Sequence, residues 1–79
     1  MNYAPKELMI MRYMYDHGGI TSREASFYCR SENLPARIYD LRRKGIPIIK
    51  EHIPPRRKGD DWFYRFHIEP EWRAANDRP

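Results

Sequence analysis

Residues 21–45 read TSREASFYCRSENLPARIYDLRRKG, and this stretch decides the fold. It opens with the capping-box pattern Thr21-Ser22-Arg23-Glu24, in which the threonine hydroxyl accepts from the glutamate N–H and the glutamate carboxylate accepts from the threonine N–H. The pattern predicts a helix from Ser22 to about Cys29 or Arg30. Its core-facing side chains are expected to be Ala25 and Cys29, with Phe27 or Tyr28 beside them.

A second helix is expected after the polar break Ser31-Glu32-Asn33, whose residue types favour helix caps. It runs from Leu34 to Lys44, and its buried side chains, spaced at i, i+4 and i+7, are Leu34, Ile38 and Leu41. Pro35 fits only the first turn, and Gly45 ends the helix. Two short helices joined by such a turn form a helix-turn-helix unit.

On the N-terminal side, Pro5–His17 is predicted to be a further helix that ends at Gly18-Gly19. Apolar residues recur there at helical spacing and form one stripe: Leu8, Ile10, Met11, Met14 and Tyr15. Ile20 is expected to be a buried link between this helix and the next.

On the C-terminal side, the isoleucine-rich segment 46–53 predicts a strand, residues 54–61 a hairpin tip, and the aromatic segment 62–68 a returning strand. The predicted fold class is therefore α+β: a winged helix-turn-helix of three helices followed by a two-stranded β-hairpin wing. With 79 residues the chain makes one domain, assigned to residues 1–68, and residues 69–79 form a tail or a short helix docked by Trp72.

Alternation along the aromatic strand puts two sets of side chains on opposite faces of the hairpin. One face carries Trp62, Tyr64, Phe66 and Ile68, and the other carries Phe63, Arg65 and His67. The first set is expected to complete the small core. The other interpretation is that exposed aromatic rings of this strand stack on unpaired bases of single-stranded nucleic acid, with Phe63 the first candidate for exposure.

The charge is concentrated in the middle of the chain. Of the formal net charge of +4, residues 31–59 hold eight basic and three acidic side chains, a local net of +5. Such a concentration indicates a polyanionic partner, and its position across the second helix of the helix-turn-helix and the wing favours double-stranded DNA.

Candidate DNA-binding residues lie on the outer face of helix 34–44 and in the hairpin tip. Asn33, Ala36 and Arg37 are assigned to base readout, Arg43 and Lys44 to phosphate contacts, and Asp40 to orienting an arginine or accepting from cytosine. Arg42, next to the buried Leu41, is expected to be structural. In the tip, Arg56, Arg57 and Lys58 are assigned to the minor groove or backbone. Both sets also have a plainer interpretation, as a solvated helix face and a solubilising loop.

No pattern of catalysis is recognisable in the sequence. His17, His52 and His67 match no metal-ligand spacing, and the single Cys29 is expected to be a buried small hydrophobic residue. We therefore expect no enzyme, no cofactor and no metal. No apolar stretch has the length of a membrane span, so a cytoplasmic protein without a membrane partner is expected.

The sequence also resembles a known group. The segments Ile10-Met11-Arg12-Tyr13-Met14, His17-Gly18-Gly19-Ile20-Thr21, Glu24-Ala25 and Ala36-Arg37-Ile38-Tyr39-Asp40-Leu41-Arg42-Arg43-Lys44-Gly45 are similar to small helix-turn-helix domains encoded by bacteriophages and prophages. The resemblance covers about residues 8–53 and implies a DNA-binding regulator, located in the host cytoplasm. The chain departs from it at Cys29-Arg30-Ser31-Glu32, where such domains commonly have a small apolar-glycine-apolar turn.

Together these features favour a sequence-specific DNA-binding protein, a phage transcriptional regulator or recombination accessory factor, either as a monomer or as a homodimer. The alternative is a winged-helix protein-interaction module that binds a host protein. Its support would be an exposed apolar patch drawn from Phe27, Tyr28, Phe63 or Trp72.

Overall fold

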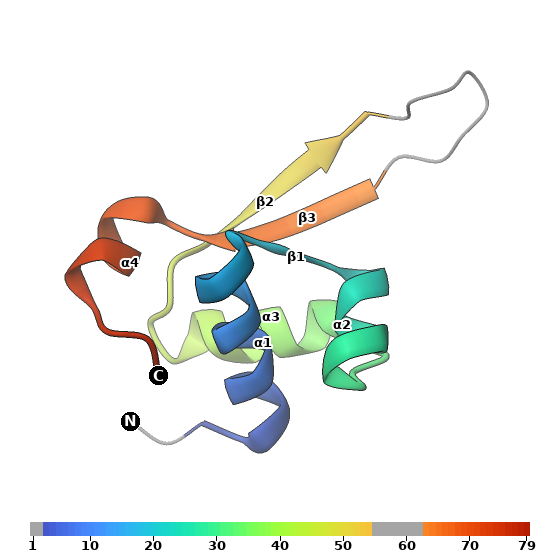
Figure 1. Ribbon diagram of the computed structural model, residues 1–79, viewed down its shortest axis with the longest axis horizontal. Helices are drawn as coiled ribbons and strands as arrows, with labels where there is room; N and C mark the ends of the chain where they lie inside the picture. The colour runs from blue at the N-terminus through green and yellow to red at the C-terminus, as the bar shows by residue number, and fades with distance from the viewer. Residues whose placement is uncertain (1–2, 55–62) are drawn as a thin grey trace.

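Four helices and three strands follow one another in the computed structural model, which describes residues 3–54 and 63–79. In chain order they are α1 (Pro5–His17), β1 (Ile20–Thr21), α2 (Ser22–Cys29), α3 (Leu34–Arg43), β2 (Ile48–Ile53), β3 (Phe63–Ile68) and α4 (Pro70–Ala75). The three long helices pack below one end of the sheet, and the β2–β3 hairpin projects beyond them (Figure 1). The expected α+β winged helix-turn-helix arrangement is confirmed.

The helix ends follow from the local sequence. The capping box predicted at the start of α2 is present, with Glu24 N–H donating to Thr21 Oγ1 (3.2 Å) and Thr21 N–H donating to Glu24 Oε1 (3.0 Å). At the end of α1, Gly18 adopts the left-handed conformation (φ 77°) and its N–H donates to the Met14 carbonyl (2.9 Å). Both signals therefore place a helix boundary through hydrogen bonds that satisfy otherwise unpaired backbone groups.

Helix α3 ends in a Schellman motif. The Ile46 N–H donates to the Leu41 carbonyl (3.1 Å) and the Gly45 N–H to the Arg42 carbonyl (3.0 Å). This closure needs a left-handed residue at Gly45, where φ is 94°. Lys44 is the C-cap, so the helix proper stops one residue before the predicted end.

The sheet has three antiparallel strands in the order β1-β3-β2 rather than the two of a simple hairpin. The extra strand is β1, where Ile20 pairs with Phe66 and Thr21 with Arg65. Ile20, expected only as a buried link, is thus both fully buried and paired in the sheet. A two-residue strand is too short to show the period-2 alternation that reveals a strand in sequence.

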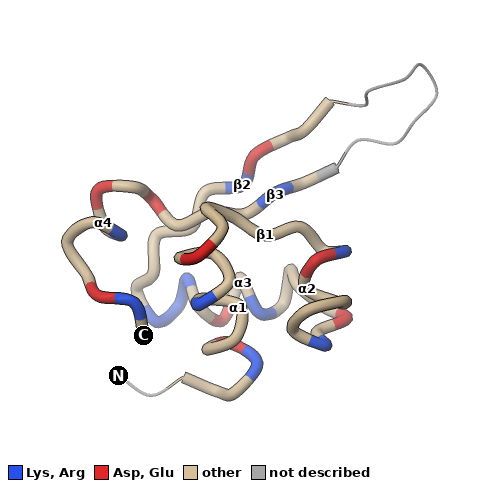
Figure 2. The backbone as a smooth tube through the Cα atoms, in the orientation of Figure 1, with Lys and Arg blue, Asp and Glu red and all other residues tan. Residues whose placement is uncertain are grey.

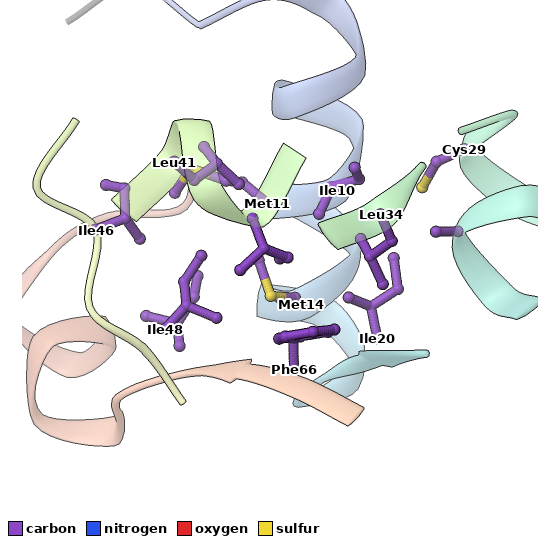
Figure 3. Close-up of a cluster of buried hydrophobic side chains, with 13 residues drawn as sticks. Ile10, Met11, Met14, Ile20, Cys29, Leu34, Leu41, Ile46, Ile48 and Phe66 are labelled. Atoms are coloured by element: carbon purple, nitrogen blue, oxygen red, sulfur yellow. The ribbon is translucent and has the colours of Figure 1, made fainter. Parts of the chain in front are cut away.

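One core joins the helices to the sheet (Figure 3). Its buried side chains are Ile10, Met11, Met14, Ile20, Ala25, Cys29, Leu34, Ile38, Leu41, Ile46, Ile48, Phe66 and Ile68. The predicted apolar stripe of α1 is largely confirmed, since Ile10, Met11 and Met14 are buried while Leu8 and Tyr15 are half-buried.

Two expectations for the core were wrong. Phe27 and Tyr28 do not accompany Ala25 and Cys29 into it, because they are 76% and 58% exposed. Ala25 and Cys29, one turn apart, already fill the core-facing side of the short α2, which turns the Phe27 ring outward. Tyr64 shares a face with Phe66 and Ile68 but is 41% exposed, because the hairpin extends past the helices at this point (Figure 1). Trp62 and the side chain of Phe63 lie outside the described residues.

After β3 the chain folds back onto α1. Trp72 of α4 packs against the core. Three side chains of α1 then hold the last residues: Tyr15 Oη donates to the Asn76 carbonyl (3.3 Å), Arg12 Nε donates to the Pro79 carbonyl (2.9 Å), and Asp16 accepts two hydrogen bonds from Arg78 (2.7 and 2.9 Å). Across residues 3–54 and 63–79, no helix has the length and apolar character needed to cross a bilayer.

Candidate nucleic-acid interface

The outward face of α3 is formed by Ala36, Tyr39 and Arg43, which lie opposite the buried Leu34, Ile38 and Leu41. Tyr39 is 61% exposed, and the Arg43 guanidinium lies 5.8 Å from the centre of its ring. Tyr39 is a further candidate residue of this face that the sequence-based assignment did not include. Its spacing, three residues after Ala36 and four before Arg43, was the signal that it shares their face.

Asn33 occupies the N-cap of α3. Its side-chain oxygen accepts from the Ala36 N–H at 3.5 Å, and the side chain is exposed at the start of the helix. A residue held in this way lies where the N-terminal turn of a recognition helix meets a ligand.

Lys44, Arg37 and Asp40 are half-buried along one flank of α3. Lys44 Nζ forms an ion pair with Glu7 Oε1 at 2.6 Å. Glu7 is only 3% exposed, and its Oε1 also accepts from the Ala4 N–H (2.8 Å). Lys44, which the sequence-based assignment gave to a phosphate contact, is therefore already paired with a buried carboxylate of the protein itself.

The environment of Glu7 explains why that carboxylate is charged. Burial alone would raise its pKa, but the hydrogen bonds from Lys44 and the Ala4 N–H, with the nearby charges of Lys44 and Arg37, hold the pKa of Glu7 below its ordinary value. Its second oxygen, Oε2, is buried with no hydrogen-bond partner among the described residues. Glu7 thus partly neutralises one flank of α3, and Arg43 dominates the charge of the outward face.

Arg42 ties α3 to the sheet. Its Nε and Nη2 both donate to the carbonyl oxygen of Ile48, at 3.2 and 2.9 Å. The expectation that Arg42 is structural is confirmed, and the contact fixes the start of β2 relative to α3.

The stem of the hairpin adds a second cationic and aromatic group. Strand register places Lys50, His52 and Tyr64 on one face, with His52 directly opposite Tyr64. Lys50 Nζ lies 4.1 Å from the centre of the Tyr64 ring, and the His52 ring meets that ring edge-on at 4.6 Å. Arg56, Arg57 and Lys58, the tip residues assigned to DNA from the sequence, lie outside the described residues.

In space, basic residues run along α3 with Asp40 among them, and both strands of the hairpin carry a basic residue, with Glu51 also on β2 (Figure 2). On α1 and α2, acidic residues alternate with basic ones (Figure 2). Among the described residues, no three His, Cys, Asp or Glu side chains come together in a group that could hold a metal ion. Cys29 is buried, and that burial raises the pKa of its thiol.

The comparisons with known proteins agree with this architecture. The family model described as "Winged helix-turn-helix domain" matches residues 5–62, from the start of α1 to the residue before β3. Searches of curated proteins and of solved structures found no match to the chain. The chain belongs to the winged helix-turn-helix domain family, a fold typical of non-enzymatic DNA-binding proteins.

Proposed function

We propose that this domain binds duplex DNA in a sequence-specific manner, with α3 in the major groove and the β2–β3 hairpin on the adjacent groove or backbone. The observation that carries the proposal is the outward face of α3, where Tyr39 and Arg43 stand exposed beside the small Ala36. A helix of this kind fits the major groove, and a small residue in its first turn allows close approach to base edges.

Within this proposal the first turns of α3 read bases and its end meets phosphate. Asn33, Ala36 and Arg37 keep the base-reading role, and Tyr39 joins them because its exposed ring can contact a thymine methyl group or a phosphate. Asp40 orients a neighbouring arginine. Arg43 takes the phosphate contact, and Lys44 contributes less because Glu7 already pairs with it.

The hairpin supplies contacts that do not depend on sequence. Lys50 lies on its stem, and Arg56, Arg57 and Lys58 follow at its tip. Cations on a projecting hairpin neutralise phosphates, which raises affinity for all sequences and makes it dependent on salt.

The biological role that fits best is a phage transcriptional regulator or a recombination accessory factor. The support is the resemblance of residues 8–53 to phage-encoded domains, together with the absence of a catalytic motif in the sequence.

Fluorescence anisotropy with a labelled duplex of random sequence, measured at several salt concentrations, tests the proposal. Arg43→Ala should weaken binding roughly tenfold at low salt and lower the slope of log affinity against log salt by about 1. Arg73→Ala is the matched control, because it removes the same charge from α4, which lies at the opposite end of the molecule from the side on which β2 and β3 project (Figure 1). Absence of binding by the unmodified protein at low salt, or equal losses for the two variants, would refute the proposal.

A further inference from the structure

The outer surface of α1 and α2 carries an aromatic patch that the proposed DNA contacts leave unused. We define this α1–α2 patch by Met9, Tyr13, His17, Phe27 and Tyr28. All members except Tyr13 are exposed, and Phe27 is the most exposed large apolar side chain among the described residues. Side chains of this size are rarely left in water without a role when they are contiguous.

The rings of the patch form a connected series. His17 lies 4.3 Å from Tyr13, Tyr13 stacks on Tyr28 at 5.5 Å, and Tyr28 meets Phe27 edge-on at 4.8 Å. Tyr13 Oη donates to Glu24 Oε2 at 2.6 Å, which anchors the series to α2. Because the rings already restrain one another, a partner that covers them immobilises little additional side-chain freedom.

The patch contains a projecting ring and recesses to receive one. A recess of about 230 Å³ lies between α1 and α2, and is lined by Met9, Arg12, Tyr13, Asp16, His17, Tyr28 and Cys29. A second, of about 320 Å³, is lined by Arg23, Glu24, Phe27 and Tyr28. A protruding ring beside recesses of this size is self-complementary, which is what a twofold interface between identical chains requires.

The charges around the α1–α2 patch indicate whether a nucleic acid or a second copy of the chain is the better partner. The rims of the two recesses hold Arg12 and Arg23 against Asp16 and Glu24, and Arg78 pairs with Asp16, so this surface is close to balanced in a chain whose net charge is +4. A nucleic acid gains nothing from a balanced surface, whereas two copies of a basic protein approach each other with least repulsion there.

We propose that a second copy of this chain binds to the α1–α2 patch, with Phe27 of each copy seated in a recess of the other about a twofold axis. The interface itself stands on the geometry of the patch. Its consequence for DNA rests on the proposed function: the dimer carries two α3 helices and binds a duplex with two inverted half-sites more tightly than a duplex with one.

Sedimentation equilibrium over a range of protein concentrations tests the dimer. The unmodified protein should shift from monomer to dimer as concentration rises, and Phe27→Ser should raise the dimer dissociation constant at least tenfold. Ile49→Ser is the matched control, because Ile49 is also an exposed large apolar side chain but lies on β2 outside the patch, and it should leave the constant unchanged. Circular dichroism checks that both variants keep the fold.

A protein that stays monomeric up to about 1 mM, a concentration at which even weak association is visible, would overturn the proposal and leave the patch to a different protein. The same holds if Phe27→Ser dimerises as well as the unmodified chain. Binding to a duplex with one half-site, measured below the dimerisation range, separates this failure from failure of the proposed function. Phe27→Ser should bind that duplex normally, and a loss as large as that of Arg43→Ala would assign Phe27 to the DNA interface instead.

Discussion

At the scale of single residues, Arg30 has a backbone conformation that favours glycine over a residue with a Cβ atom. It is the C-cap of α2 with φ 51° and ψ 36°, the one non-glycine residue with positive φ among those described. The resembling domains commonly have glycine in this turn, and a residue with a Cβ pays a steric cost in the left-handed region. Arg30 therefore places backbone strain in the turn between α2 and α3.

Arg30→Gly should therefore increase the free energy of unfolding by about 0.5–1 kcal/mol, after allowance for the greater freedom of glycine in the unfolded chain. Urea denaturation measures the change. Arg23→Gly, which removes the same side chain from the first turn of α2, is the control and should lower stability by about 0.5–1 kcal/mol. A loss of stability in both variants would show that strain at Arg30 is negligible.

Glu7 is a second residue whose replacement should have a large effect on the free energy of unfolding. Its carboxylate is buried, pairs with Lys44 at 2.6 Å and accepts from the Ala4 N–H. Glu7→Gln keeps the shape but leaves Lys44 without its counter-charge, so stability should fall by about 1–3 kcal/mol in urea denaturation. Glu71→Gln, on the exposed surface of α4, should change stability far less.

The same pairs set the pH range of stability. Glu7 and Glu24 have lowered pKa values, because the hydrogen bonds from Lys44 and Ala4 and those from Tyr13 and Thr21 outweigh the effect of burial. Their stabilisation is present above the ordinary carboxylate pKa of 4.5 and is lost as pH falls through the lowered values. Burial and the Glu24 hydrogen bond raise the pKa of Tyr13 from 10 to about 12, so its contribution is complete below pH 10 and is lost as pH rises toward 12.

Thermal melts across pH should therefore give a plateau between these limits, with a decline on each side. Glu7→Gln should make the acid decline shallower and leave the alkaline decline in place. Tyr13→Phe should make the alkaline decline shallower by removing the group that titrates near pH 12. It should also lessen the acid decline, because Glu24 loses the Tyr13 hydrogen bond that lowers its pKa. An acid decline that is identical in the unmodified protein and in Glu7→Gln would argue against the lowered pKa of Glu7.

At the scale of elements, α3 uses its adjacent arginines for different purposes. Arg42 binds the Ile48 carbonyl twice, while Arg43 projects from the outward face beside Tyr39. Arg42→Ala should lower the free energy of unfolding by about 0.5–1.5 kcal/mol, because the contact is partly exposed and two hydrogen bonds to one acceptor are not additive. Arg43→Ala should leave unfolding nearly unchanged and act on DNA affinity. If instead Arg42→Ala lowers DNA affinity and Arg43→Ala lowers the free energy of unfolding, the assignment of Arg43 to the outward, DNA-facing side of α3 is wrong.

The elements themselves were largely predictable from sequence. Pro5, the Thr21–Glu24 capping box and the glycines at 18 and 45 mark helix ends through backbone chemistry that acts locally. Strand β1 was not predictable, because two residues have no periodicity and their pairing with β3 spans more than 40 positions in the sequence. The outward orientation of Phe27 was missed because α2 is so short that composition alone did not show which side is buried.

The candidate site was predictable only in part, for a related reason. Helical spacing found the outer face of α3, but it does not show that Lys44 meets Glu7, 37 positions earlier in the sequence. An exposed glutamate and a buried paired one look the same in sequence. Tyr39 was overlooked because a charge-based search favours cations, although an exposed aromatic ring on the same face can contact DNA as well.

At the scale of the whole molecule, positive charge is concentrated in the middle of the chain and the C-terminal segment is acidic. Residues 31–59 carry a net +5 and include α3 and β2, whereas residues 60–79, which include β3 and α4, carry three basic and five acidic side chains. Such an asymmetry orients a protein in the field of a polyanion before contact, so encounter with DNA should place α3 and the hairpin first.

The hairpin tip gives the corresponding prediction for the whole molecule. Replacing Arg56, Arg57 and Lys58 together by Ala removes three of the eight basic side chains in residues 31–59. Affinity should fall for every duplex alike, and the slope of log affinity against log salt should drop by about 2–3, since each lost phosphate contact releases roughly one counterion fewer. Arg37→Ala, by contrast, should relax the base preference recovered by selection from a random DNA pool. A triple variant with an unchanged salt slope would mean that Arg56, Arg57 and Lys58 do not contact DNA, and α3 and Lys50 would then have to account for binding.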